Sequence, residues 1–253
     1  MPILRLLTTL VAPLALVAVV LSAAPAVAGN AWQQKWPNTD FSKHAVDLDE
    51  IHSGGPGKDG IPSIDAPVFS GVTEGFAELA PTEPVVSLTI AGDARAYPLR
   101  ILIWHEIVND VVGGVPVAVT FCPLCNAAIV FDRRVEGEAL EFGTTGNLRN
   151  SGLIMYDRQS ESWWQQYTGN AIIGAMTGER LRSVPARMES AERFAARHPG
   201  GRVLVPNDPD MRPYGINPYK GYDSMPVPFL YDGSMPDGLP AMTRVVVIGD
   251  MAW

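Results

Sequence analysis

The chain has 253 residues, of which 47% are hydrophobic and 18% charged, and it contains only two cysteines. This composition excludes a disordered chain, which is poorer in apolar residues, and a small disulfide scaffold, which is richer in cysteine. The formal net charge of −8 argues against a nucleic-acid-binding surface, because such surfaces are basic.

Residues 1–28 are typical of a secretory signal peptide. Arg5 gives the positive start, an uncharged apolar run covers residues 6–21, and Ala26 and Ala28 form the small-x-small pattern that signal peptidase cleaves. An uncleaved membrane anchor is the alternative, since the run is nearly long enough to span a bilayer. No cysteine lies near the cleavage position, so a lipoprotein is not expected. We therefore expect a periplasmic or secreted protein with no membrane contact beyond the export signal.

The remaining chain predicts an irregular N-terminal segment over residues 29–58 and a single domain over residues 59–240. Helices are predicted from Pro98 through residue 108 and over residues 190–197, where Pro199 and two glycines follow. Strands are predicted wherever β-branched and aromatic residues lie between turn residues. They cover residues 85–90, 94–97, 115–121, 128–134, 139–142, 153–156, 163–165 and 171–173.

Short strands separated by frequent turns predict a mainly β fold with a few short helices, an α+β protein with an antiparallel sheet core. The 24 glycines and 22 prolines agree with long Gly/Pro-rich loops, which we expect over residues 207–239. Residues 241–253 begin a further strand, predicted over residues 244–248. A strand that stops in the middle of its pattern is typical of a shortened form of a longer chain.

The strongest candidate site is the C-P-L-C segment that contains Cys122 and Cys125, with His105 and Glu106 a short way upstream. A turn of this kind aims two sulfurs at one metal ion, and Pro123 stiffens it. The two sulfurs and the His105 imidazole are sufficient ligands for a soft ion such as Cu(I), with zinc as the alternative metal. In this hypothesis Glu106 holds the His105 ring in one tautomer.

The same two cysteines are also compatible with a thiol–disulfide or thiol-nucleophile enzyme. Cys122 then attacks, Cys125 resolves the mixed disulfide, and Glu106 serves as the general base. Thioredoxin-type chemistry places the first cysteine at a helix N-terminus, whereas the residues after Cys125 read as a strand. A structural thiol pair or a small disulfide is the third interpretation, and for Glu106 a solvated helix face is the alternative.

A second candidate site lies in the segment over residues 142–152, which is rich in Gly, Thr, Asn and Ser. Backbone N–H groups of such loops bind anions, and Arg149 and Arg158 are candidates to clamp a carboxylate or phosphate. Trp164 is a candidate to stack on a ligand. The alternatives are a β-turn network, a local ion pair between Asp157 and Arg158, and a tryptophan in the core. The sequence has no nucleotide or flavin motif.

Several short sequence segments, spread over most of the chain, occur in the order that is typical of a known family. They are KDGIPSID (58–65), AYPLR (96–100), HEIVND (105–110), TFCPLCNAA (120–128), FDR (131–133), MYDR (155–158), ESWWQQ (161–166) and NPYKGY (217–222). Together they resemble the prokaryotic family called domain of unknown function 3179. The resemblance implies an exported protein with no settled biochemical role, and family members often continue beyond the point at which this chain stops.

The leading functional hypothesis is an exported copper-type metal-binding protein or metalloenzyme that uses His105, Cys122 and Cys125. The alternatives are a thiol enzyme with Cys122, Cys125 and Glu106, or a non-catalytic module that binds a ligand. The expected partner is a small-molecule or protein substrate and not a nucleic acid.

Overall fold

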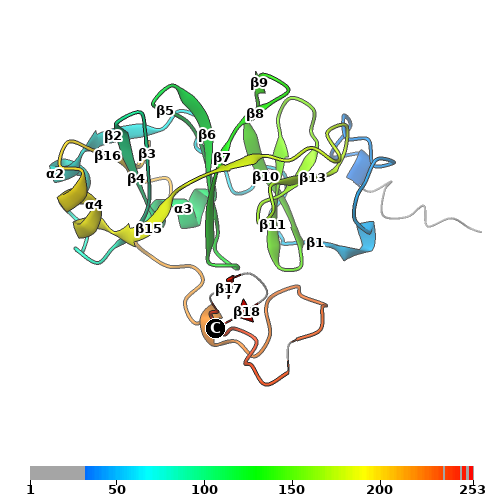
Figure 1. Ribbon diagram of the computed structural model, residues 1–253. Coiled ribbons are helices and arrows are strands. Elements are labelled where there is room, and N and C mark those ends of the chain that lie inside the picture. The colour runs from blue at the N-terminus through cyan, green and yellow to red at the C-terminus, as the bar shows by residue number, and fades with distance from the viewer. Residues whose placement is uncertain (1–31, 236, 246, 249–250, 253) are drawn as a thin grey trace, which may run out of the picture.

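The structure is a computed structural model that describes residues 32–235, 237–245, 247–248 and 251–252 (Figure 1). The described chain is mainly β, with short helices and mostly antiparallel strand pairs, which confirms the predicted fold class. The predicted signal peptide lies outside the described residues. None of the helices among the described residues has both the length and the apolar character that crossing a membrane requires.

The central sheet carries the two cysteines, in the spatial order β14-β7-β6-β5. Its strands are β5 (Ile107–Val112), β6 (Val115–Cys122), β7 (Ala127–Asp132) and β14 (Arg182–Val184). Gly113 and Gly114 join β5 to β6 with φ angles of 53° and 82°, a conformation that glycine adopts without strain. The buried valines of β6 explain why this segment forms a central strand.

The helix predicted from Pro98 through residue 108 is wrong at its C-terminal end. Helix α3 (Leu99–His105) stops at Glu106, which has a left-handed φ of 59°. The chain then continues as β5, paired with β6 from Ile107 opposite Thr120 to Val112 opposite Val115. Four of the six residues of β5 are β-branched, so pairing in the sheet prevails over the helical pattern.

A second sheet has the order β15-β3-β4-β16-β2. Its strands are β2 (Val68–Gly71), β3 (Pro84–Ile90), β4 (Asp93–Pro98), β15 (Arg187–Ser190) and β16 (Arg202–Val205). β3 and β4 form the predicted hairpin, whereas β16 lies parallel to β4. Helix α4 (Ala191–Arg197), the second predicted helix, joins β15 to β16 and buries Phe194, and α2 (Val72–Gly75) follows β2.

The third sheet has the order β1-β10-β11-β12-β13. Its strands are β1 (Ile51–Ser53), β10 (Phe142–Arg149), β11 (Gly152–Asp157), β12 (Trp163–Gln165) and β13 (Asn170–Ile173). β8 (Arg134–Val135) and β9 (Glu138–Ala139) form a small separate hairpin. The N-terminal segment predicted as irregular contributes the 3₁₀ turn η1 (Leu48–Glu50) and strand β1, and its Trp36 packs edge-on against Trp163 with ring centroids 5.2 Å apart.

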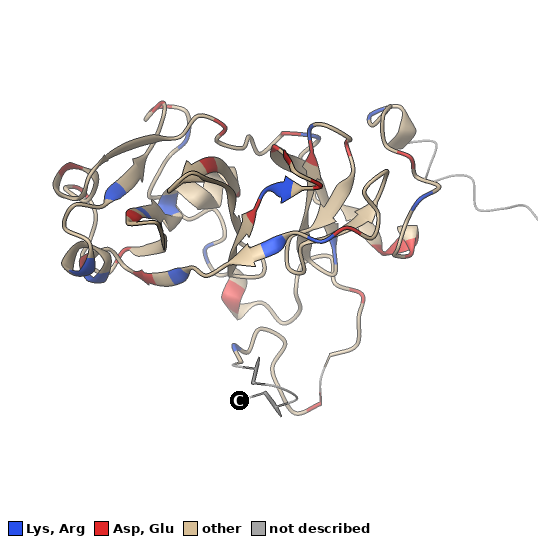
Figure 2. Ribbon diagram, turned by 45° about the horizontal axis from the view of Figure 1, so that its top comes forward, with Lys and Arg blue, Asp and Glu red and all other residues tan. Residues whose placement is uncertain are grey.

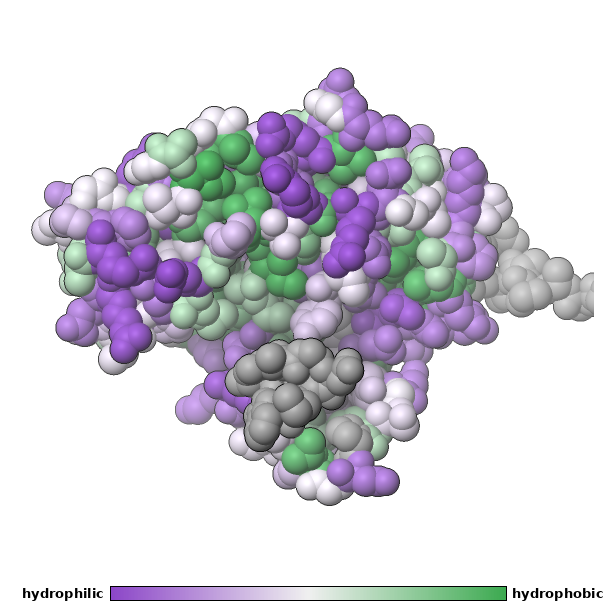
Figure 3. Space-filling model, viewed as in Figure 1, coloured by the Kyte–Doolittle hydropathy of each residue, from purple (hydrophilic) through white to green (hydrophobic). Residues whose placement is uncertain are grey.

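An apolar core between the central and third sheets fixes the position of the cysteine turn. Cys122, Phe131, Met155 and Trp164 belong to this core, and each is at most 2% exposed. Outside the core, hydrophilic and hydrophobic residues alternate over the face seen in Figure 3. Acidic and basic residues are interspersed along the strands and loops (Figure 2).

Residues 206–235 and 237–245, here called the C-terminal stretch, form long loops with one short 3₁₀ turn, η2 (Tyr222–Ser224), and loops were predicted over residues 207–239. In Figure 1 the C-terminal stretch lies below the central and third sheets. It holds most of the exposed large hydrophobic residues, namely Met211, Ile216, Met225, Val227, Phe229, Leu239 and Val245. The strand predicted over residues 244–248 is shorter in the structure, where β17 (Val247–Ile248) pairs with β18 (Met251–Ala252).

Candidate functional site

The C-P-L-C segment is the turn between β6 and β7, and it brings the two sulfurs together. Cys122 is the last residue of β6, and Asn126 closes the turn with a left-handed φ of 46° and donates its N–H to Pro123 O at 3.2 Å. The two cysteines are free, with Sγ atoms 2.7 Å apart, and the Cys125 N–H lies 3.4 Å from the Cys122 sulfur. Two thiols that close together can exchange a proton or form a disulfide.

The two sulfurs have different surroundings. Cys122 is 1% exposed and belongs to the core, whereas Cys125 is half-buried. The Cys122 thiol donates to Cys125, and this hydrogen bond together with burial raises the pKa of Cys122. The same bond lowers the pKa of Cys125 despite the opposing effect of burial, and the Leu153 backbone adds to the lowering. Cys125 is therefore the better thiolate and the more accessible one.

Glu106 is the third member of the site and lies at the junction of α3 and β5. Its backbone N–H donates to Leu102 O at 2.6 Å, and its carbonyl accepts from Phe121 N at 2.8 Å, which fixes the left-handed turn. The residue is only 6% exposed, and its carboxyl makes no hydrogen bond with the part of the chain that the structure describes. Burial, with a contribution from Cys122, raises the pKa of Glu106 to about 8. The group is thus mostly protonated at pH 7.

A cleft of about 1130 Å³ leads from the surface to Cys125. Its walls come from α3, the cysteine turn, the β10–β11 turn and the C-terminal stretch, through Leu99, Asn150, Ser151, Tyr219 and Tyr222 among others. Cys122 and Glu106 do not line the cleft and lie behind Cys125. A molecule that enters this cleft therefore meets the Cys125 sulfur first.

The environment of His105 differs from the one that its predicted role as a metal ligand requires. Its ring is 4% exposed, and both nitrogens are engaged, Nδ1 with Pro62 O at 2.8 Å and Nε2 with the Tyr214 hydroxyl at 2.7 Å. Burial lowers the pKa of this imidazole. The described residues contain no group of three or more His, Cys, Asp or Glu side chains placed to hold a metal ion. Two of the three predicted ligands are thus adjacent, and copper binding stays a prediction.

The three side chains predicted to bind a ligand each have separate protein partners. Arg149 Nε donates to Glu50 Oε2 at 2.6 Å, and Arg158 forms ion pairs with Asp59 at 3.0 Å and Asp65 at 3.2 Å. The Trp164 ring is fully buried, and its Nε1 donates to Asp157 Oδ2 at 2.9 Å. Both faces of the indole are covered by the core, so Trp164 does not present a stacking surface.

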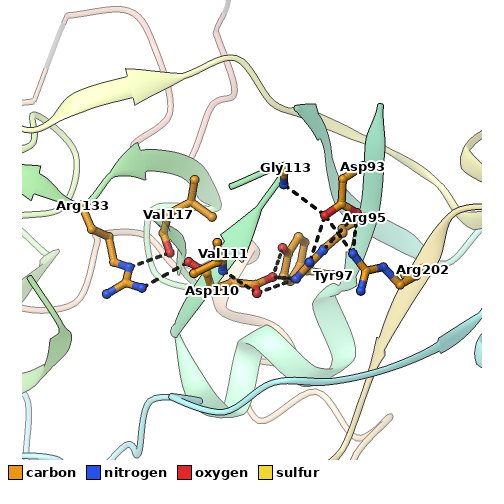
Figure 4. A network of polar contacts seen from close by, with 9 residues as sticks. All are labelled: Asp93, Arg95, Tyr97, Asp110, Val111, Gly113, Val117, Arg133 and Arg202. Carbon is orange, nitrogen blue, oxygen red and sulfur yellow. Dashed lines mark hydrogen bonds and ion pairs between the residues drawn. The ribbon is translucent and has the colours of Figure 1, made fainter. Parts of the chain in front are cut away.

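A second buried carboxyl, Asp110, lies on β5, the strand that follows Glu106, but has a different environment (Figure 4). Arg95 donates to both of its oxygens, the Tyr97 hydroxyl donates to Oδ2 at 2.6 Å, and the Val111 N–H donates to Oδ1 at 2.7 Å. Arg95 also pairs with Asp93 at 2.9 Å. This polar network ties β4 to β5 and leaves no free acceptor on the carboxylate.

Sequence reasoning missed the residues that form the far wall of the cleft. Tyr219 and Tyr222 come from the NPYKGY segment, which the sequence marked only as part of a family resemblance. Asn150 and Ser151 form the β10–β11 turn with φ angles of 51° and 62°. The signal for these residues was present as turn composition, but their position beside Cys125 depends on the packing of distant segments.

Residues 58–252, most of the chain, match a family model described as a protein of unknown function, DUF3179. No curated protein and no solved structure matches the chain.

Proposed function

Since the chain belongs to the DUF3179 family, for which no function is assigned, we propose a function from the site itself: thiol–disulfide exchange. Cys125 attacks, Cys122 resolves, and Glu106 exchanges a proton with Cys122. The observation that carries the proposal is the buried Glu106 carboxyl, with its pKa raised to about 8, behind a pair of thiols whose sulfurs are 2.7 Å apart. A strongly perturbed acid beside a reactive pair in a cleft is typical of functional sites.

In the first step the Cys125 thiolate attacks one sulfur of a substrate disulfide R–S–S–R′. The bond between Cys125 and R–S forms, the substrate S–S bond breaks, and R′–S⁻ leaves and takes a proton from water. The hydrogen bond from Cys122 and the Leu153 backbone support the thiolate here. They take the place of the helix N-terminus that thioredoxin-type sites use.

In the second step Glu106 reacts in its ionised form, which is the minor form at pH 7. The Cys122 thiol gives its proton to this carboxylate and attacks Cys125 Sγ. The Cys122–Cys125 disulfide forms and R–S⁻ leaves, so two electrons pass from the protein dithiol to the substrate. The reverse sequence oxidises a pair of substrate thiols. These roles exchange the two cysteines relative to the order expected from the sequence, because Cys125 lines the cleft and Cys122 is buried.

Trapping the mixed disulfide tests these roles. Reduced wild type, Cys122→Ser and Cys125→Ser are reacted with oxidised glutathione at neutral pH and examined by mass spectrometry. Cys122→Ser is expected to accumulate the glutathione adduct on Cys125, whereas the wild type loses two hydrogens and forms the internal disulfide. Cys125→Ser, which keeps only the buried sulfur, is expected to react at least about tenfold more slowly. Equal rates in the two variants, or no adduct in Cys122→Ser, would overturn the proposal.

Metal analysis of the same reduced protein addresses the copper prediction. A metal bound in stoichiometric amount by the wild type, and lost in both serine variants, would favour a metal site over exchange chemistry. We also propose that the protein acts outside the cytoplasm, on the evidence of the signal-peptide pattern in residues 1–28. Fractionation of cells that express the full chain checks this location.

A further inference from the structure

One wall of the cleft includes a segment of prolines and large apolar residues, Met-Pro-Val-Pro-Phe over residues 225–229, here called the MPVPF segment. Hydrogen bonds hold both of its ends against Tyr222. The Met225 N–H donates to Tyr222 O at 3.1 Å, and the Phe229 N–H donates to the Tyr222 hydroxyl at 3.0 Å. The two prolines fix their own φ angles, so the backbone between these two contacts is restricted.

Short contacts connect the MPVPF segment to Cys125. Tyr222 and Pro228 line the cleft together with Cys125. The Cys125 sulfur lies 3.7 Å from Ser151 O, and the Ser151 hydroxyl lies 3.4 Å from the Tyr222 hydroxyl, which accepts the Phe229 N–H. A molecule that has reached the Cys125 sulfur therefore lies next to the MPVPF segment.

The large side chains of the MPVPF segment are exposed. Met225 is 45% exposed, Val227 is 55% exposed and Phe229 is 45% exposed. These three side chains do not line the cleft, whereas Pro228 does, so apolar surface continues from the cleft onto the outside of the segment. Large apolar side chains that remain exposed as a group are typical of a surface that binds a partner. A partner that covers both parts is longer than a ligand confined to the cleft.

The size and charge of the cleft do not match a small, highly charged disulfide such as oxidised glutathione. The cleft volume of about 1130 Å³ exceeds the roughly 300–1,000 Å³ of typical small-molecule sites. The charged residues of the cleft have both signs and are Arg100, Lys220, Arg244, Glu83 and Asp223. Arg100 and Glu83 lie 3.4 Å apart and offset one another. Several carboxylates on one small ligand would instead be complementary to a clear excess of basic residues.

We propose that the substrate is a disulfide of an incompletely folded polypeptide, whose apolar side chains beside the disulfide pack on the MPVPF segment while Cys125 attacks. This inference rests on the proposed function and names its substrate class. Folding buries such side chains, so they are accessible beside a disulfide before folding is complete. In the attack the bond between Cys125 and one substrate sulfur forms, the substrate S–S bond breaks, and the second cysteine of the polypeptide leaves as a thiolate.

Matched peptide disulfides test this substrate class. Two synthetic peptides of equal length and charge each carry one cysteine as a mixed disulfide with the coloured thiol 2-nitro-5-thiobenzoate. Phenylalanine and valine flank the cysteine in one peptide, and serine and glycine flank it in the other. Glutathione with the same leaving group is the small-molecule probe. Because the attacking sulfur and the leaving group are the same in every reaction, a difference in the rate of colour release reports recognition of the flanking residues.

The wild type is expected to react with the apolar peptide at least about tenfold faster than with the polar peptide or the glutathione probe. Val227→Ser and Phe229→Ser are each expected to reduce this preference by about threefold or more. Val68→Ser is the matched control, because Val68 lies on β2 in the second sheet and is 47% exposed. This variant is expected to keep the full preference.

Two outcomes overturn the substrate class and leave thiol–disulfide exchange in place. They are equal rates with the two peptides, and a loss of preference in Val68→Ser as large as the loss in Val227→Ser. The absence of colour release from every probe overturns the proposed function itself. Sedimentation at the assay concentration gives a second readout. A wild-type dimer that Phe229→Ser dissociates would show that a second copy of the chain covers the MPVPF segment, and this result also overturns the inference.

Discussion

Glu106 and Asp110 are two buried carboxyls four residues apart in the chain, and their hydrogen-bonding environments are opposite. Each is 6% exposed. Asp110 accepts hydrogen bonds from Arg95, Tyr97 and the Val111 backbone, whereas Glu106 has no partner among the described residues. The partnered carboxyl stabilises the junction of two strands, and the unpartnered one lowers stability when it ionises.

This difference shows which of the two is structural. The hydrogen bonds to Asp110 engage both of its oxygens and join the residues of β4 to β5. Glu106 lacks such a set of donors among the described residues, has a left-handed backbone, and has a pKa that is raised by burial and by the charge of Cys122. Local strain and a strongly perturbed acid together are features that folds retain at functional sites.

Removing the partnered carboxyl has the largest expected effect. Asp110→Ala leaves the Arg95 guanidinium and the Tyr97 hydroxyl without their buried acceptor, and the free energy of unfolding is expected to fall by about 5 kcal/mol. Urea denaturation measures the loss. A loss below about 1 kcal/mol would show that the network is not a structural support and would remove the contrast with Glu106.

The pH dependence of stability tests the unpartnered carboxyl. The pKa of Glu106 is raised in the fold to about 8, so the folded protein binds one more proton than the unfolded chain between about pH 5 and pH 8. The stability from this group is therefore present at low pH and is lost as pH rises, by about 3 kcal/mol over that window. Glu106→Gln is expected to remove this component. Denaturation of both proteins at pH 5 and pH 8 checks it, and identical pH slopes would contradict the assignment.

The tyrosine that donates to Asp110 sharpens the comparison further. Tyr97→Phe removes the hydrogen bond to Asp110 and is expected to lower the free energy of unfolding by about 1.5 kcal/mol without changing thiol reactivity. Thermal unfolding and the reaction with oxidised glutathione are measured on the wild type and on Tyr97→Phe. A slower thiol reaction in the variant would oppose the distinction between the two carboxyls.

The smallest effect is expected at the outer end of the C-terminal stretch. Asp232 lies 2.9 Å from His52, but its side chain is 79% exposed. An ion pair so accessible to water contributes little, and Asp232→Asn is expected to change stability by less than about 0.5 kcal/mol. A larger change in the melting temperature would mean that this contact holds the stretch that forms the wall of the cleft.

Local patterns predict the parts of this protein that local contacts decide. The 85–97 hairpin and the C-P-L-C turn lie where turn residues and β-branched runs place them. The helix predicted as far as residue 108 was too long, because residues 107–112 gain more from pairing with β6 than from a further helical turn. Strand β1 was missed because three residues in a polar segment give too weak a pattern.

For the same reason, only part of the candidate site could be predicted from the sequence. Cys122 and Cys125 are neighbours through one turn, so their spacing alone predicts their meeting. The partner of His105 is Tyr214, more than a hundred residues away, and nothing near His105 in the sequence signals that contact. Tyr219 lines the cleft together with Cys125 from the same distant stretch, and no pattern near the cysteines signals this.

The parallel pairing of β16 with β4 has a consequence for how the chain folds. The sheet that contains β3 and β4 is complete only when residues 187–205 arrive, and the intervening segment with the cysteine turn must be enclosed as a long loop. Contacts of such sequence separation slow folding. The thiols are therefore accessible while the fold is still incomplete. With only two cysteines in the sequence, the growing chain offers them no wrong partner within itself.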